Sequence, residues 1–211
     1  MTYGELYQRV RRQLNDNITP YRWPDSALRM YSGTVLRRMA EVAPQTMAEI
    51  RPTTLDEGAL QTVPSWAVRF LGGVRRDIDG KSLRNVSPEL MDNVLPGWRD
   101  DPPSEYTTDC IYDMSVPGEF GVHPPALEGT VLHIRASVVA DDPVAEDEVI
   151  PAARVNEIAL LHGLLGLCFS EDTDVGDLQL AAQHWGQFYD ALGVQRQIDA
   201  ENPPMAKEDQ G

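Results

Sequence analysis

Histidine is the side chain that could most readily carry acid–base catalysis or hold a metal in this chain of 211 residues. The four histidines are His123, His133, His162 and His184. No two of them lie within five residues of one another, and none stands at zinc-ligand spacing from a cysteine. His162 falls in an apolar helical pattern, which is typical of a packed core residue. We therefore expect no metal and no cofactor.

Other catalytic patterns are also missing from the sequence. Residues 70–74 are glycine-rich but lack the lysine and the following helix of a phosphate-binding loop, and no nucleophile-elbow motif occurs. Cys110 and Cys168 are predicted to be free, partly buried thiols, since an apolar setting raises the pKa of a thiol and makes it unreactive. The chain is therefore predicted not to be an enzyme.

Charge is spread unevenly along the chain, which has a net charge of −15. Residues 1–51 hold 8 basic and 5 acidic side chains, residues 52–150 hold 7 and 18, and residues 151–211 hold 3 and 10. Such an acidic chain is not expected to grip DNA by releasing counterions from phosphates. No apolar run approaches the roughly 18 residues of a membrane span, and no secretory signal is visible. We expect synthesis in the cytoplasm and no membrane contact.

Helical patterns occupy both ends of the chain. Helices are predicted over residues 2–15, 24–43, 151–170 and 177–192. Thr2 and Glu5 form a capping box at the first, and Pro24 suits the first turn of the second. None of these helices can bury its apolar stripe alone, so one bundle built from both ends of the chain is predicted.

The middle of the chain carries strand and turn signals. Residues 50–55 with 60–63, and residues 67–77 with 83–86, are predicted hairpins. Residues 130–139 alternate apolar and polar side chains, which predicts a half-buried antiparallel strand. The predicted fold class is α+β: a helix bundle formed by the N- and C-terminal helices, with an inserted antiparallel β-rich domain and an extended C-terminal tail. Its predicted parts are residues 1–45, 46–149, 150–193 and 194–211.

Several motifs follow one another over about residues 20–195. They are Tyr21-Arg22-Trp23-Pro24-Asp25, the Gly-x-x-Gln-x-x-Pro pattern of residues 58–64, Leu95-Pro96-Gly97-Trp98, the segment 117–125 that ends in Pro-Pro, and the helix end at residues 188–193. Together they resemble the phage adaptor family, also described as head-to-tail connectors or tail tubular protein A-like proteins. Gly121 and His123 stand where members of that family often carry aromatic or aliphatic residues.

The resemblance implies a structural virion protein at the head–tail junction, made in the host bacterial cytoplasm. Such adaptors form a dodecameric ring under the portal, extend the DNA channel and provide the platform for the tail nozzle or hub. The implied partners are the portal protein, the nozzle or hub protein and neighbouring copies of the chain, with genomic DNA passing through the lumen without specific binding. The alternative is a neck or stopper (head-completion) protein of a long-tailed phage. A small hydrolase or metal enzyme with an unrecognised site is a remote alternative.

Two sets of residues are predicted to contact these partners. The portal-binding set combines the tail with arginines of the first helix: Arg196, Ile198, Pro203, Pro204, Met205, Arg9, Arg11 and Arg12. The tail has no helical or strand periodicity that would bury its apolar residues within the chain. These residues are therefore expected to be buried against a partner. The nozzle-binding set lies in loops of the β-rich domain: Asp77, Asp79, Gly80, Asp100 and Asp101.

Overall fold

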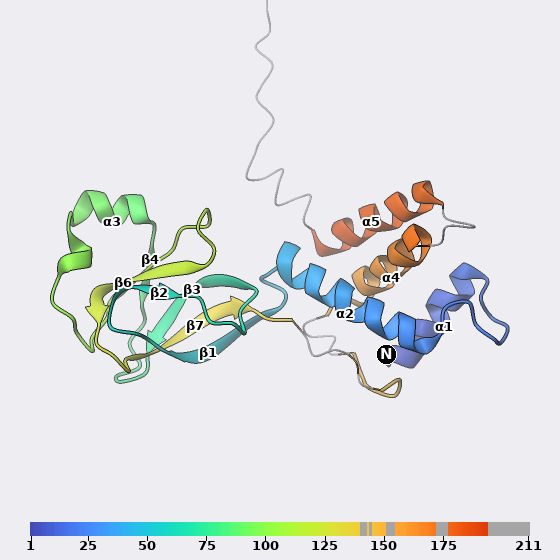
Figure 1. Cartoon of the computed structure of the whole chain (residues 1–211), viewed down its shortest axis with the longest axis horizontal. Coiled ribbons are helices and arrows are strands. Elements are labelled where there is room, and N and C mark those ends of the chain that lie inside the picture. The colour runs from blue at the N-terminus through green and yellow to red at the C-terminus, as the bar shows by residue number, and fades with distance from the viewer. Residues whose placement is uncertain (140–142, 144, 151–154, 172–176, 194–211) are drawn as a thin grey trace, which may run out of the picture. The chain divides into compact units, whose positions relative to one another are not determined.

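The computed structural model describes residues 1–139, 143, 145–150, 155–171 and 177–193 (Figure 1). The chain divides into two compact units, of which residues 44–139 form one and the segments before and after them form the other. We call these the β unit and the helical unit. Helices from both ends of the chain and a β-rich middle confirm the predicted α+β class. The predicted tail, residues 194–211, lies outside the described residues.

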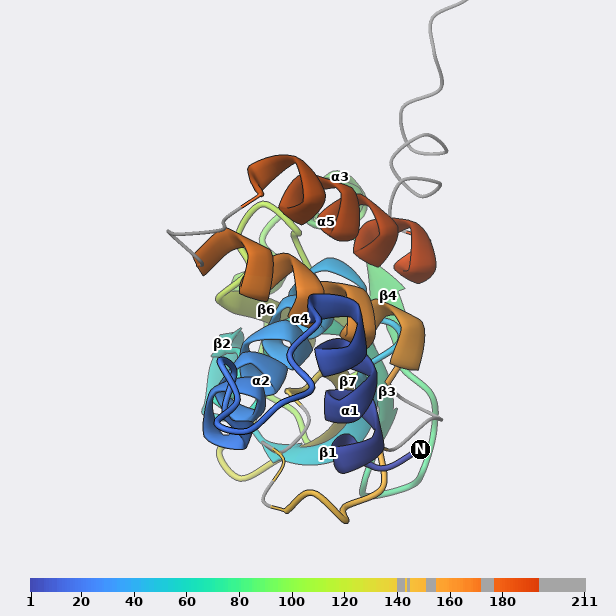
Figure 2. The ribbon, with the colours of Figure 1, turned by 90° about the vertical axis from the view of Figure 1, so that its right-hand side faces the viewer.

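The helical unit contains four helices. They are α1 (Tyr3–Leu14), α2 (Asp25–Val42), α4 (Glu157–Glu171) and α5 (Leu178–Leu192). Helix α4 lies between α5 on one side and α1 and α2 on the other (Figure 2). The predicted capping box of Thr2 and Glu5 is present at the start of α1. Helix α4 begins later than predicted, because the Asn156 side chain accepts hydrogen bonds from the N–H groups of Ile158 and Ala159 and so caps it.

Glycines let the neighbouring helices approach α4 closely. A Cβ at Gly163 would stand 2.5 Å from Cγ1 of Val35 on α2, and a Cβ at Gly166 would stand 3.0 Å from Nε1 of Trp185 on α5. Apolar residues at the starts of α4 and α5 are not all buried: Ile158 is 62% and Leu178 is 75% exposed.

The β unit contains two sheets. The three-stranded sheet has the order β1-β7-β3 and the four-stranded sheet the order β2-β6-β5-β4. The strands are β1 (Ala48–Thr54), β2 (Gly58–Thr62), β3 (Arg69–Arg76), β4 (Arg84–Val86), β5 (Asp109–Ile111), β6 (Glu119–Ala126) and β7 (Val131–Ser137). Side chains of both sheets form one apolar core, in which Phe70 stacks on Phe120 with ring centres 4.6 Å apart. The alternation predicted for residues 130–139 is confirmed in β7, where Leu132 and Ile134 are fully buried.

The first predicted hairpin is wrong. Strand β1 pairs with β7, whereas β2 pairs with β6 in the other sheet. Leu55 enters the core at the corner between them, and the Gln61 side chain closes that corner through hydrogen bonds with the backbone of Asp56 and Gly58. Burial of Leu55 therefore turns the chain from one sheet into the other instead of folding it back on itself.

The second predicted hairpin is only a local turn. Arg75 and Ser82 form an isolated antiparallel bridge, but β4 then leaves β3 and pairs in parallel with β5. A short helix, α3 (Pro88–Val94), follows β4, with Ser87 as its N-cap. A 3-10 turn, η1 (Trp98–Asp100), follows it. Side chains of α3 and η1 pack with β2 and β5 in a second small core of Ala59, Met91, Trp98 and Ile111.

Candidate partner-binding surfaces

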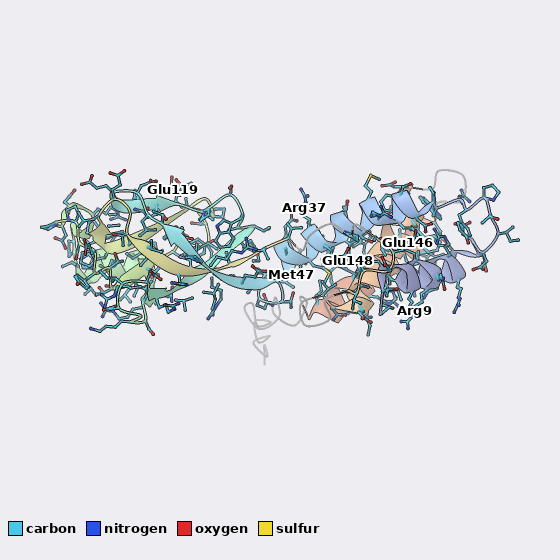
Figure 3. All side chains as sticks on the ribbon, turned by 90° about the horizontal axis from the view of Figure 1, so that it is seen from below. Arg9, Arg37, Met47, Glu119, Glu146 and Glu148 are labelled. Carbon is cyan, nitrogen blue, oxygen red and sulfur yellow. The ribbon has the colours of Figure 1, made fainter. Side chains whose placement is uncertain are left out.

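Arginine is the only basic residue type in the first 43 residues. These arginines are Arg9, Arg11, Arg12, Arg22, Arg29, Arg37 and Arg38. Arg9 and Arg12 are both exposed and lie three residues apart on the same face of α1. In Figure 3 the side chains of Arg9 and Arg37 extend from the helical unit on opposite sides. Arginine suits contacts with carboxylate and phosphate groups, because its planar guanidinium donates two parallel hydrogen bonds.

Arg11, the third arginine predicted to bind the portal, is placed differently. Its side chain is only 7% exposed and forms an ion pair with Asp25 at the start of α2. Its Nη2 also donates to the carbonyl oxygen of Trp23 at 3.0 Å, and its guanidinium lies 4.1 Å from the ring centre of Tyr21. Arg11 therefore holds the α1–α2 junction together from inside.

The Tyr-Arg-Trp-Pro-Asp motif, residues 21–25, lies at this junction between α1 and α2. The carboxylate of Asp16 accepts hydrogen bonds from the backbone N–H groups of Arg22 and Trp23, each at 2.9 Å. The Trp23 ring meets Tyr31 edge-on at 5.8 Å. The carbonyl oxygen of Pro24 accepts hydrogen bonds from the N–H groups of Ala27 and Leu28 in α2. All five motif positions thus contact Arg11, Asp16 or α2, which shapes the loop between α1 and α2.

A small pocket of about 200 Å³ opens beside the junction. It is lined by Gln8, Arg11, Arg12, Asn17 and Tyr21. The two arginines were predicted to bind a partner, and Tyr21 was noted only as part of the motif of residues 21–25. Gln8 and Asn17 were not predicted: Gln8 is a polar residue of α1 and Asn17 lies in the loop after it, and only the fold of that loop brings them together with Arg11.

The turn at residues 77–80, predicted to bind the nozzle, is stabilised by hydrogen bonds to the side chain of Asp79. Asp79 accepts hydrogen bonds from Arg76 at 2.9 and 2.7 Å and from the N–H of Lys81 at 3.1 Å. Desolvation by itself would raise the pKa of Asp79, but the hydrogen bonds from Lys81 and Arg76 hold that pKa below its ordinary value. Gly80 has a φ of +68°, which favours glycine at this position.

Asp77 also lines a second pocket, of about 320 Å³ in the β unit. Its lining includes Ile78, Glu105, Leu127 and Glu128. The Asp77 carboxylate lies 2.9 Å from Nε2 of His133 and its side chain is 57% exposed. The fold therefore joins Asp77 to two acidic residues that sequence analysis did not select, since Glu105 and Glu128 belong to segments remote from it in sequence.

Asp100 and Asp101, the other two predicted nozzle contacts, have different surroundings. Asp100 is exposed at the end of η1, whereas Asp101 lies 3.0 Å from Nε2 of His123. The other ring nitrogen of His123 lies 3.5 Å from the buried carboxylate of Asp109, which forms an ion pair at 2.7 Å with the exposed side chain of Arg84. His123 therefore links a surface loop to a buried carboxylate.

Histidine and cysteine side chains are the groups that could hold a metal or act as nucleophiles in this chain. No group of three His, Cys, Asp or Glu side chains within the described ranges could hold a metal ion. Cys110 and Cys168 are free and buried, as predicted. Burial raises the pKa of each to about 12, so neither thiol is ionised near neutral pH. In the part of the chain that the structure describes, no helix is long and apolar enough to cross a membrane.

The sequence of the chain was compared with curated proteins and with models of protein families. No curated protein matches the chain. The family model of the SU10 adaptor protein matches residues 1–207, which include both units. This is a family of structural phage adaptors, which is not an enzyme class, and membership implies a place in the virion and contacts with portal and tail proteins. Because the match covers nearly all of its 211 residues, the chain belongs to the SU10 adaptor protein family of phage adaptors.

Proposed function

We propose that copies of this chain form a dodecameric ring under the portal, extend the DNA channel there and provide the platform for the tail nozzle or hub. The observation that carries this proposal is the family match over residues 1–207, which spans the helical unit and the β unit alike. Their chemistry differs, since the first helices are rich in arginine whereas acidic side chains line the pocket beside Asp77. Two such surfaces suit two different protein partners.

We assign the contact with the portal to the helical unit. Arg9 and Arg12 are exposed on α1 and are available for ion pairs, whereas the charge of Arg11 is used inside the unit. The tail residues complete this contact: Arg196, Ile198, Pro203, Pro204 and Met205. They lie outside the described residues, and their assignment rests on the sequence.

The nozzle contact is assigned to the loops of the β unit. Asp77 and Asp100 present their carboxylates at the surface, while Asp79, Gly80 and Asp101 shape the two loops. Residues 44–139 contain 14 acidic and 8 basic side chains. A channel surface formed by residues with this excess of negative charge would repel the phosphates of DNA and leave the passing DNA mobile.

Sedimentation of the full chain with and without a purified portal ring from the same phage tests this function. The expected result is a slowly sedimenting species that enters a large stoichiometric complex only when the portal is present, and a weaker shift when residues 194–211 are deleted. A chain that stays small beside the portal would contradict the proposal. If that chain instead enters a complex with a neck or tail protein, the stopper function replaces the adaptor function.

A further inference from the structure

The pocket at the α1–α2 junction is built almost entirely from hydrogen-bond donors. Gln8, Asn17 and Tyr21 can each donate, and Arg11 and Arg12 supply two guanidinium groups. No carboxylate lines it. Two carboxylates of the α1–α2 junction are already engaged, because Asp25 pairs with Arg11 and Asp16 accepts two backbone N–H groups. The pocket is therefore chemically complementary to an acceptor that carries negative charge.

Arg11 is also incompletely satisfied by the helical unit itself. Its Nη2 serves Asp25 and Trp23, but its Nε is buried and has no hydrogen-bond partner among the described residues. A buried donor without a partner is unfavourable. Arg12 adds a second guanidinium to the same pocket, and its side chain is exposed. An incoming acceptor would thus meet one arginine already fixed in place and one that is free to close on it.

The size and surroundings of the pocket favour a protein side chain as its occupant. At about 200 Å³ it is smaller than the roughly 300–1,000 Å³ of pockets that enclose small-molecule ligands. Ile18, the residue after Asn17, is 82% exposed, and an apolar residue beside arginine is typical of protein interfaces. DNA phosphates are a poorer match, because binding to DNA draws on many basic side chains at once and this chain has a net charge of −15.

We propose that the pocket of Gln8, Arg11, Arg12, Asn17 and Tyr21 receives the carboxylate of an Asp or Glu side chain of the portal protein. This inference rests on the proposed adaptor function and adds the chemistry of recognition to it. Arg12 forms a forked pair with the carboxylate, Gln8 and Asn17 complete its hydrogen bonds, and Ile18 packs against the portal surface next to it. Arg11 positions Tyr21 and gives the pocket its shape.

Arg12→Glu tests the pocket, with Arg37→Glu on α2 as the matched control. Both residues are exposed arginines of the helical unit and both changes reverse one charge, but Arg37 neither lines the pocket nor belongs to the proposed portal contact. Binding to the purified portal ring is measured by sedimentation at several concentrations of full-length chain. We expect Arg12→Glu to weaken binding by about tenfold or more, Arg12→Lys to weaken it less, and Arg37→Glu to have a much smaller effect.

The possible results separate the pocket from the adaptor function. If the unmodified chain binds the portal and Arg12→Glu binds equally well, the pocket proposal is overturned while the adaptor function stands. Equal weakening by Arg37→Glu and Arg12→Glu would also overturn it, since general charge steering would then explain both. If the unmodified chain does not bind the portal at all, the adaptor function fails first. Tight binding of a short DNA duplex that Arg12→Glu abolishes would replace the carboxylate with phosphate.

Discussion

Gly121 of β6 lies directly against Trp98 of η1: a Cβ at Gly121 would stand 2.7 Å from Cη2 of Trp98. Trp98 is 1% exposed, and its indole N–H donates to Asp92 at 2.8 Å. The close packing of η1 on the four-stranded sheet therefore depends on a residue without a side chain at position 121.

The first prediction is that Gly121→Ala destabilises the protein. The added methyl group would have to displace a ring that is packed on all sides, which costs about 1–3 kcal/mol of unfolding free energy. Urea denaturation followed by tryptophan fluorescence measures the loss. Gly118→Ala is the control, because no atom lies within 4 Å of a Cβ at Gly118 and its φ is not positive. Equal stability of the two variants would show that Trp98 can move without cost.

A second prediction concerns the ion pair of Arg11 and Asp25. Asp25→Ala removes the carboxylate and leaves a guanidinium that is only 7% exposed without its charged partner. Breaking a fully buried pair costs about 3–5 kcal/mol. Asp25 is 35% exposed, so screening by solvent reduces the expected loss to about 1–3 kcal/mol. Chemical denaturation measures it, with Arg9→Ala as an exposed control expected to change stability by less than about 0.5 kcal/mol.

Gly163 of α4 provides a third prediction. A Cβ there would lie 2.5 Å from Val35 and 3.3 Å from Phe188, so Gly163→Ala pushes α4 away from α2 and α5. The clash outweighs the gain of up to about 1 kcal/mol that alanine brings to a helix, and the melting temperature should fall. Gly186→Ala on α5 has no atom within 4 Å and should raise it. Adding Val35→Ala to Gly163→Ala should recover part of the loss, which a merely local helix effect would not allow.

Local chemistry explains which elements could be predicted from the sequence. The capping box of Thr2 and Glu5 and the alternation of β7 each involve residues within one element, so a short stretch of sequence contains the whole signal. Strand pairing involves distant residues. Ala48 pairs with Ser137, and no feature near either residue distinguishes β7 from β2 as the partner of β1. The predicted hairpin was wrong for this reason.

The candidate site shows the same limit. Arg11 was predicted to bind the portal together with its neighbours Arg9 and Arg12, which requires an exposed side chain. Its burial depends on Asp25, which belongs to another helix and follows a loop whose shape the sequence does not reveal. Position on the helix offers a partial signal. Arg11 follows Val10, which is fully buried, and so borders the apolar stripe.

The final prediction is a loss of stability at mildly acidic pH that comes from His162 and His184. Their Nδ1 atoms lie 3.0 Å apart between α4 and α5, and the His184 ring stacks on Phe169. Burial lowers the pKa of both histidines below the ordinary value of 6.5, and the charge of His162 lowers that of His184 further. Near pH 6.5 and below, the unfolded chain therefore binds more protons than the folded chain, and the free energy of unfolding falls as the pH decreases.

Melting temperatures at pH 7.5 and pH 5.5 measure this effect, since most carboxylates stay ionised across that interval. His184→Asn keeps a polar group near the position of Nδ1 but removes the titration. Its melting temperature should therefore fall less between the two pH values than that of the unmodified protein. His133→Asn, which changes a histidine of the β unit beside Asp77, should leave the contribution of the helical unit intact. An equal fall in the unmodified protein and in His184→Asn would show that protons are taken up elsewhere, because removing one member of a coupled pair must change the number of protons bound on unfolding.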